Sequence, residues 1–319
     1  MPGSLPDILP LEPHLRPMVW GGHRLGERFG KDLPPDTPVG ESFEVSALPG
    51  AESVVRSGPL AGWGLSDLTE GFGEALLGAP VRERHGPGFP LLIKLIDAAD
   101  DLSVQVHPGD GYARREGLGP RGKTEAWYVL APGELALGLR EGVDRRRLER
   151  ALDTGRPEEA VRYCHVQAAD VVLLPAGTVH ALGRGTMVYE VQQASDLTFR
   201  LYDYGRPGLD GRPRELHLEQ AMEVIDFEAP ASEPRPAPAP GPEGEVLVEA
   251  DSFRLTLFGE GNRLLGSEVF AAVTVVAGEA RLGDVPLAAG DSALVPADRR
   301  VPLRPAGPSL RCLVAEPAC

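Results

Sequence analysis

Short apolar runs separated by glycine and proline are the feature that most constrains how this chain can fold. The 319 residues include 39 glycines and 32 prolines, spread along the whole length. Several runs alternate apolar and polar residues, which is the period of a half-buried strand. Glycine and proline between such runs are typical of turns. The pattern predicts a mainly β fold with few helices, closed as a barrel or a sandwich.

The predicted strands fall into two series. The first lies at 42–46, 90–96, 102–107, 126–130, 170–174 and 187–192, and the second at 246–248, 253–258, 269–276, 279–282, 292–296 and 309–315. Helical patterns are fewer, and the best are at 68–77 and 143–156.

A break in composition separates the two series. Dense proline and alanine at 229–244 indicate a semi-rigid, extended linker. We therefore predict a first domain at 1–228 and a second, smaller β domain at 245–319. The phrases AADVVLLPAGTVHALGRG and AAGDSALVPADRRVPLRP form a weak internal repeat, and the second copy lacks histidine. The last domain is thus expected to carry no metal ligand and to brace the first domain or form an oligomer contact.

The charge balance narrows the classes of partner. The chain has 47 acidic and 32 basic side chains and a net charge of -15, which disfavours nucleic acid and anionic membranes. No signal peptide or membrane-spanning apolar run is recognisable, so we expect a cytoplasmic protein. The net charge does not exclude a small anionic substrate, because a local cluster of lysine and arginine can outweigh it.

Four nitrogen and oxygen donors stand out in the first domain. Gln105 and His107 are two residues apart on a predicted strand, so their side chains share a face. Glu125 precedes the apolar run AWYVL, and His180 lies near a strand end. Such donors suit Zn²⁺, Fe²⁺ or Mn²⁺. The three cysteines lack ligand spacing, which favours an exchangeable catalytic metal over a closed structural one.

Several segments resemble the sequence blocks of type I mannose-6-phosphate isomerases, a zinc family of the cupin superfamily. They are VWGGHRLGERFG, PVGESFEVSALPG, LSVQVHPGD, GKTEAWYVL, PAGTVHALG and YEVQQASDLTFRLYDY, and their order matches the family. The resemblance covers roughly the first two-thirds of the chain and is weak in the last domain. It is nearest to the shorter bacterial branch of the family.

The resemblance implies a cupin-type jelly-roll β-barrel followed by a second cupin-like domain. It implies one Zn²⁺ per chain, held by His107, Glu125 and His180. Gln105 matches a fourth ligand of the longer family members. Zinc, manganese and cobalt all stay open as the native metal.

The resemblance also implies the residues that act on the substrate. Arg200 matches the family's catalytic arginine, and Lys123 and Glu190 match other active-site positions. Lys94 and Ser103 match positions that face the substrate phosphate. On residue type alone, Lys94 has a plain alternative, because a lysine on a strand often extends its ammonium group into solvent.

The implied reaction interconverts mannose 6-phosphate and fructose 6-phosphate by moving a proton between C1 and C2. A metal ion would stabilise the enediolate. Glu190 is the preferred base, because burial raises a carboxyl pKa towards neutrality, and Lys123 is the competitor.

Two other functions compete with this interpretation. One is another cupin metalloenzyme, such as a different sugar-phosphate isomerase or an iron oxygenase. The other is a sugar-binding cupin without activity, which would not need Lys123 and Arg200 beside the donors. The sequence does not determine the oligomeric state or any side activity on other sugar phosphates.

Overall fold

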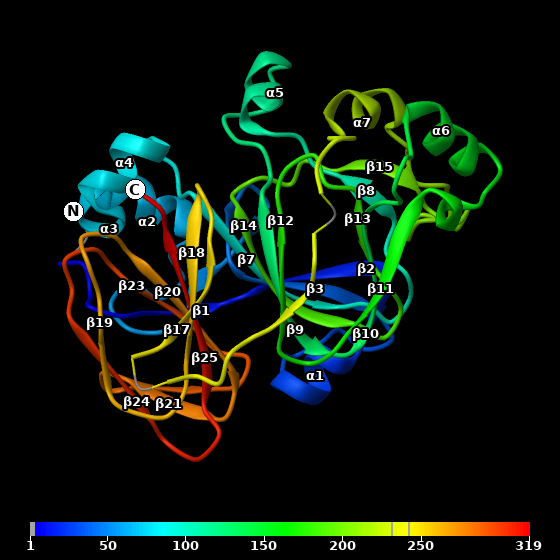
Figure 1. Cartoon of the computed structure of the whole chain (residues 1–319). Coiled ribbons are helices and arrows are strands. Elements are labelled where there is room, and N and C mark those ends of the chain that lie inside the picture. Colours follow the sequence, from blue (N-terminus) through cyan, green and yellow to red (C-terminus); the bar gives the residue numbers. More distant parts are fainter. Residues whose placement is uncertain (1–3, 231, 242) are drawn as a thin grey trace.

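The computed structural model describes residues 4–230, 232–241 and 243–319. Its strands form two lobes that lie side by side, and most helices gather at one end (Figure 1). The prediction of a mainly β fold with few helices is confirmed by strands β1–β25 and helices α1–α7 of the described residues. No helix in this part of the chain is long and apolar enough to cross a membrane.

Two sheets build the first lobe, and an apolar cluster between them contains residues of both, such as Trp127 and Leu137. The larger sheet has the order β16 (Arg235–Pro236), β12 (Asp170–Leu174), β9 (Glu125–Ala131), β14 (Met187–Gln193), β7 (Leu91–Asp97), β3 (Val39–Val45), β2 (His14–Gly22). The smaller has the order β11 (Val161–Val166), β10 (Gly133–Leu139), β13 (His180–Leu182), β8 (Val104–Val106), β15 (Phe199–Tyr202).

The second lobe also has two sheets. The larger has the order β17 (Glu245–Glu249), β18 (Phe253–Phe258), β25 (Arg311–Pro317), β20 (Ala271–Ala277), β23 (Ser292–Val295), β1 (Leu9–Glu12), β6 (Val54–Val55). The smaller has the order β19 (Arg263–Leu265), β24 (Val301–Pro305), β21 (Glu279–Leu282), β22 (Val285–Ala288). A separate pair joins β4 (Ala47–Leu48) and β5 (Ala51–Glu52).

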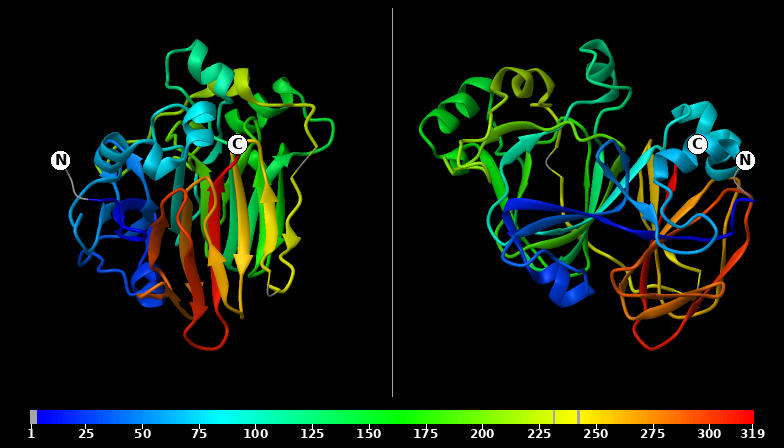
Figure 2. Two further views of the ribbon diagram at one scale, coloured as in Figure 1. Left: turned by 90° about the vertical axis from the view of Figure 1, so that its left-hand side faces the viewer. Right: turned by 180° about the vertical axis from the view of Figure 1, so that it is seen from behind.

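Two segments cross between the lobes. Near the N-terminus, β1 pairs with β23, so the sheet of the second lobe contains a strand from the start of the chain (Figure 2). Within the predicted linker, β16 pairs with β12 and extends the larger sheet of the first lobe. The limits 1–228, 229–244 and 245–319 stay a prediction. Residues 231 and 242 of that linker lie outside the described residues.

The larger sheet of the first lobe is covered on both faces. All seven residues of β7 are buried. Its odd-numbered apolar residues, such as Ile93, share an apolar cluster with Leu255 and Phe270 of the second lobe. Its even-numbered Ile96 packs inside the first lobe. Because side chains alternate along a strand, even-numbered polar residues of β7 also point to the inside of the first lobe.

The helices are short. They are α1 (Arg24–Phe29), α2 (Leu65–Phe72), α3 (Glu74–Leu77), α4 (Ala79–His85), α5 (Asp110–Arg115), α6 (Arg145–Asp153) and α7 (Leu218–Val224). The helical pattern at 68–77 is confirmed as two helices, because Gly73, with a φ of 47°, ends α2 and separates it from α3. The helix predicted at 143–156 is confirmed as α6, whose first turn is capped by the Asp144 carboxylate.

Candidate active site

The site lies between the two sheets of the first lobe. On the smaller sheet, Gln105 of β8 pairs with His180 of β13 on one side and with Arg200 of β15 on the other. These three residues therefore form a row across adjacent strands. On the larger sheet, Glu125 is the first residue of β9 and faces this row. His107 follows the end of β8, which stops at Val106, one residue earlier than we predicted.

Three buried donor groups converge there. One ligand atom from each of His107, Glu125 and His180 lies within 4.8 Å of the other two. Glu125 Oε2 is 3.4 Å from His107 Nε2, and Glu125 Oε1 is 3.3 Å from His180 Nε2. The three side chains are at most 2% exposed. Two imidazoles and one carboxylate are a set of donors that suits Zn²⁺.

Backbone carbonyls fix which nitrogen of each histidine carries the proton. His107 Nδ1 donates to the Leu197 carbonyl (2.8 Å), and His180 Nδ1 donates to the Thr178 carbonyl (2.9 Å). In the neutral rings Nε2 is then an acceptor, and both Nε2 atoms point towards Glu125. The hydrogen bond from Nδ1 to a backbone carbonyl, on the side of the ring away from the donor group, is typical of metal-binding histidines.

The electrostatics keep these groups in their ligating forms. Burial, with the Lys123 ammonium next in importance, lowers the pKa of His107 to about 3. Burial also lowers the pKa of His180. For Glu125 burial acts to raise the pKa, but Lys123 and the two histidines outweigh it and hold the pKa well below its usual value. The donors are thus two neutral imidazoles and one carboxylate.

The donor atoms already converge on a positive charge. Lys123 Nζ lies 2.8 Å from Glu125 Oε2 and 3.0 Å from His107 Nε2, and its side chain is almost fully buried. Glu125 Oε2 is held by this ion pair, whereas Glu125 Oε1 has no hydrogen-bond donor among the described residues. A fully buried carboxylate that requires a positive charge, placed between two imidazole acceptors, fits a bound divalent cation.

Gln105 adjoins the three donors. Its Nε2 lies 3.3 Å from His180 Nε2, and its Oε1 accepts a hydrogen bond from Ser103 Oγ at 3.4 Å. Ser103 Oγ in turn accepts a bond from Arg200 Nε at 3.3 Å. A chain of contacts thus runs from the donor group to the guanidinium of Arg200.

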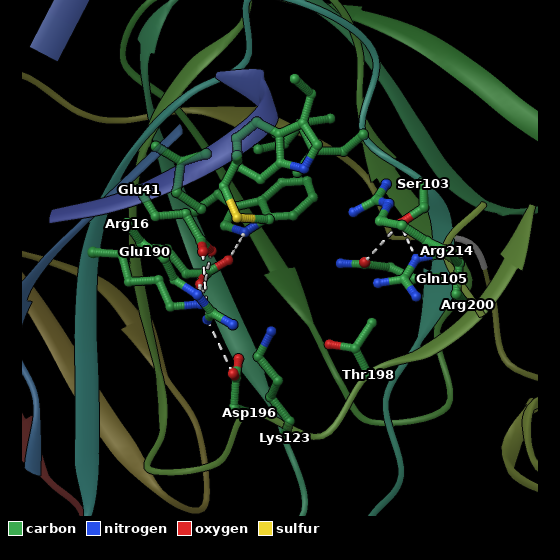
Figure 3. A pocket seen from close by; sticks show the side chains of 17 residues that line it. Arg16, Glu41, Ser103, Gln105, Lys123, Glu190, Asp196, Thr198, Arg200 and Arg214 are labelled. Carbon is green, nitrogen blue, oxygen red and sulfur yellow. Dashed lines mark hydrogen bonds and ion pairs between the residues drawn. The ribbon is translucent and has the colours of Figure 1, made fainter. Parts of the chain in front are cut away.

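A pocket opens beside the donors, and Figure 3 shows polar side chains on two opposite walls. We define the acidic wall as Arg16, Glu41, Glu190 and Asp196 together with Lys94, which is paired with Glu41 and Glu190. Three carboxylates face two cations there, so one negative charge is in excess. The pocket is also lined by Met18, Trp20, Ile96, Leu102, Ser103, Gln105, Lys123, Trp127, Leu182, Thr198, Arg200 and Arg214.

Lys94 is the buried centre of the acidic wall. Its Nζ lies 3.1 Å from Glu190 Oε1 and 3.3 Å from Glu41 Oε1, and the residue is 2% exposed. Although burial acts to lower the pKa of Lys94, the two carboxylates raise it above its usual value. Glu190 Oε2 accepts a bond from Trp127 Nε1 at 2.8 Å. Lys94 thus does not extend into solvent.

At the edge of this wall, Arg16 lies 3.0 Å from Asp196 and 3.6 Å from Glu41. Burial acts to raise the pKa of Asp196, but Lys94 and Arg16 lower it overall. Neither Arg16 nor Asp196 was among the predicted site residues.

The opposite wall is basic, and we define the basic wall as Ser103, Arg200 and Arg214 (Figure 3). Asp203 binds the guanidinium groups of both Arg214 and Arg206. Arg200 Nη1 donates to the Glu215 carbonyl (2.8 Å). The basic wall itself holds two guanidinium groups and no carboxylate, and Asp203 behind it is shared between Arg214 and Arg206, so a positive excess remains on this wall.

All nine predicted site residues lie at this pocket or at the adjoining donor group. The sequence analysis missed Glu41 and Arg214 as well as Arg16 and Asp196. Glu41 and Asp196 lie within the segments PVGESFEVSALPG and YEVQQASDLTFRLYDY that carried the resemblance, so those segments held the available signal. Arg214 lies in a loop with no pattern of its own.

Known mannose-6-phosphate isomerases are similar to this protein along most of the chain. Residues 8–139 match the family model described as phosphomannose isomerase type I, catalytic domain. A mannose-6-phosphate isomerase of Streptococcus mutans is 36% identical over 85% of this chain and 85% of its own. The Bacillus subtilis enzyme ManA, named a mannose-6-phosphate isomerase, is 36% identical over 89% of this chain and 91% of its own.

Solved structures agree as well. A mannose 6-phosphate isomerase from Bacillus subtilis matches with a TM-score of 0.82 at 28% identity, covering 98% of this chain and 99% of its own. A zinc-bound mannose 6-phosphate isomerase shares the fold, with a TM-score of 0.78 at 20% identity over 98% of this chain and 100% of its own. The predicted cupin-type fold is confirmed by this likeness. From these matches and the shared extent, the chain belongs to the mannose-6-phosphate isomerase family, type I.

Proposed function

We propose that this protein interconverts mannose 6-phosphate and fructose 6-phosphate with one Zn²⁺ ion held by His107, Glu125, His180 and Gln105. The observation that carries the proposal is the convergence of three buried donors beside a pocket with one acidic and one basic wall. Membership of the family supports the choice of substrate.

The charges of the two walls suggest how the substrate lies. We place the phosphate at the basic wall, where Arg200 and Arg214 supply charge-assisted donors and Ser103 supplies a hydroxyl. The excess negative charge of the acidic wall would repel a phosphate. Arg214 therefore replaces Lys94 as the residue expected to bind the phosphate, and Ser103 keeps the phosphate-binding role expected from the sequence. C1 and C2 then lie towards the donors and Glu190.

Glu190 is the residue that we propose as the base. Its Oε2 is fixed by Trp127 and its Oε1 by Lys94, so the carboxylate is held in one orientation at the pocket. It would remove the C2 proton and return it at C1. Lys123 is the weaker choice, because its ammonium is paired with Glu125 and donates to His107.

The other residues would stabilise and orient the reacting sugar. Zn²⁺ in this site would supply a Lewis acid that stabilises negative charge on the carbonyl oxygen of the open-chain sugar. Arg200 would hold the substrate without exchanging a proton, because a guanidinium stays charged. Lys94 would hold the Glu190 carboxylate in place through their ion pair. The cytoplasmic location stays a prediction from the sequence.

The test is an isomerase assay with mannose 6-phosphate on the purified protein, before and after treatment with EDTA and after adding Zn²⁺ back. We expect EDTA to abolish turnover and Zn²⁺ to restore it, with one zinc per chain by elemental analysis. Zinc bound at one per chain without turnover would contradict the substrate. Full turnover in metal-free protein would contradict the metal.

A further inference from the structure

The segment 215–217 lies along the outer edge of β15, which is the last strand of the smaller sheet. The backbone N–H and carbonyl of Arg200 point towards this edge. The His217 N–H donates to the Arg200 carbonyl at 2.8 Å, and the Arg200 N–H donates to His217 Nδ1 at 3.2 Å. One residue therefore satisfies both backbone groups that Arg200 presents at the edge, where a strand edge would otherwise leave them unpaired.

The imidazole takes the place of a backbone carbonyl in this contact. A neighbouring strand would accept from the Arg200 N–H with its carbonyl oxygen, whereas here a side-chain nitrogen accepts. Nδ1 must be unprotonated for this, so the neutral ring carries its proton on Nε2. That atom lies 4.0 Å from Glu215 Oε2, and the side chain of His217 is 25% exposed.

The same segment also fixes the guanidinium of Arg200. Nη1 donates to the Glu215 carbonyl at 2.8 Å, two residues before His217. Directly after His217, α7 begins, and its Ala221 and Met222 pack in one apolar cluster with Phe199 and Leu201 of β15. His217 thus connects a packed helix to the backbone of Arg200.

We propose that His217 is a positioning residue that holds Arg200 in the orientation needed to bind the substrate phosphate. It acts by accepting the Arg200 N–H with Nδ1 and by fixing the segment whose Glu215 carbonyl holds the guanidinium. The proposal rests on the proposed function, because it assumes that Arg200 contacts a sugar phosphate.

Protonation of His217 would remove the acceptor. Burial lowers the pKa of this histidine below 6.5, with Glu215 opposing that effect and Arg200 adding to it. The Glu215 carboxylate approaches Nε2 of the ring to 4.0 Å, and Arg200 contacts the ring through its backbone N–H. The neutral form therefore prevails at pH 7, and the contact is lost as the pH falls through the lowered pKa.

Two variants separate hydrogen bonding from packing. In His217→Asn the amide oxygen sits where Nδ1 was and accepts a hydrogen bond, but the ring is gone. In His217→Phe the ring is kept beside Phe199, 6.1 Å away between centroids, but the acceptor is gone. His165→Phe is the matched control, because His165 is 81% exposed on β11.

The readouts are KM and kcat for mannose 6-phosphate and the Kd of mannitol 1-phosphate, a polyol phosphate without a carbonyl, by calorimetry. We expect His217→Phe to raise KM and Kd about tenfold, because a partly buried N–H loses its acceptor, while kcat changes less than about threefold. His217→Asn and His165→Phe should stay within about threefold of wild type.

A pH series adds a readout that packing would not move. As the pH is lowered from about 7.5 through the lowered pKa of His217, Kd should rise more in wild type than in His217→Asn, because position 217 can take up a proton only in wild type. The substrate phosphate titrates equally for both proteins and cancels in the comparison.

The outcomes separate the positioning role from the proposed function. Normal KM and Kd in a folded His217→Phe, or losses in His217→Asn that match those in His217→Phe, would overturn the positioning role. If His217→Phe fails to fold, the comparison of His217→Asn with wild type across pH decides. Wild-type protein that binds mannitol 1-phosphate but turns over no mannose 6-phosphate would contradict the proposed function and leave the binding comparison intact.

Discussion

At the scale of single residues, the site depends on charges that are buried in pairs. Lys94 shows this best: residue type alone allowed its ammonium to reach solvent, but Glu41 and Glu190 enclose it. Taking an ion out of water is costly unless a partner and further hydrogen bonds offset the cost. The partners come from β3 and β14, so sequence distance gave no indication of the pairing.

Changing Glu190→Gln tests the base at this scale. The variant keeps the shape of the side chain but cannot take a proton, so we expect kcat to fall about 10³-fold with the zinc content unchanged. Steady-state kinetics with elemental analysis gives both quantities. Glu41→Gln is the control, since it also removes a carboxylate partner of Lys94 and should cost much less. If kcat falls equally in the two variants, the loss of a negative charge beside Lys94 explains the effect, and Lys123 becomes the preferred base.

At the scale of elements, alternation along a strand places the site. On β14, Tyr189 and Val191 belong to the apolar cluster shared with the second lobe, whereas Glu190 faces the pocket. The same period could be predicted from the sequence. The sequence could not predict which face of the strand packs against the second lobe, because both faces carry apolar residues.

The pairing of β2 with β3 depends on close backbone contact at Gly21. A Cβ there would lie 2.4 Å from the backbone nitrogen of Gly40, so one strand would have to shift. We expect Gly21→Ala to reduce the free energy of unfolding by about 1–3 kcal/mol, measured by urea denaturation. Gly111→Ala in α5 has open space around its Cβ and should stay within about 1 kcal/mol of wild type. A Gly21→Ala protein as stable as this control would contradict the packing argument.

At the scale of the whole molecule, a buried polar network joins the lobes. Lys31 Nζ lies 2.8 Å from Glu44 and donates to the Gly290 carbonyl of the second lobe at 2.7 Å. Ser292 of β23 also donates to Glu44, at 3.2 Å. Glu44 is 1% exposed, and it lies on β3, the strand that carries Glu41 at the pocket. The second lobe therefore supports the strand behind the acidic wall.

Removing this carboxylate should weaken the whole protein. Glu44→Ala leaves the Lys31 ammonium without its partner, and we expect the free energy of unfolding to fall by about 3–5 kcal/mol. Thermal and urea unfolding measure the loss. Glu279→Ala, at an exposed position of β21, is the control and should be nearly neutral. If Glu44→Ala unfolds like the control, the network does not hold the lobes together.

The sequence by itself determined the mainly β architecture, twelve of the strands β1–β25 and the family, and it named nine candidate site residues, because period, turn residues and ordered segments are local properties. Only the tertiary structure decided how those residues are combined. It paired Lys94 with two carboxylates, set Arg214 beside Arg200, and added β1 to the sheet of the second lobe. These contacts join residues far apart in the chain, and the burial and charge that decide them exist only after the sheets have packed.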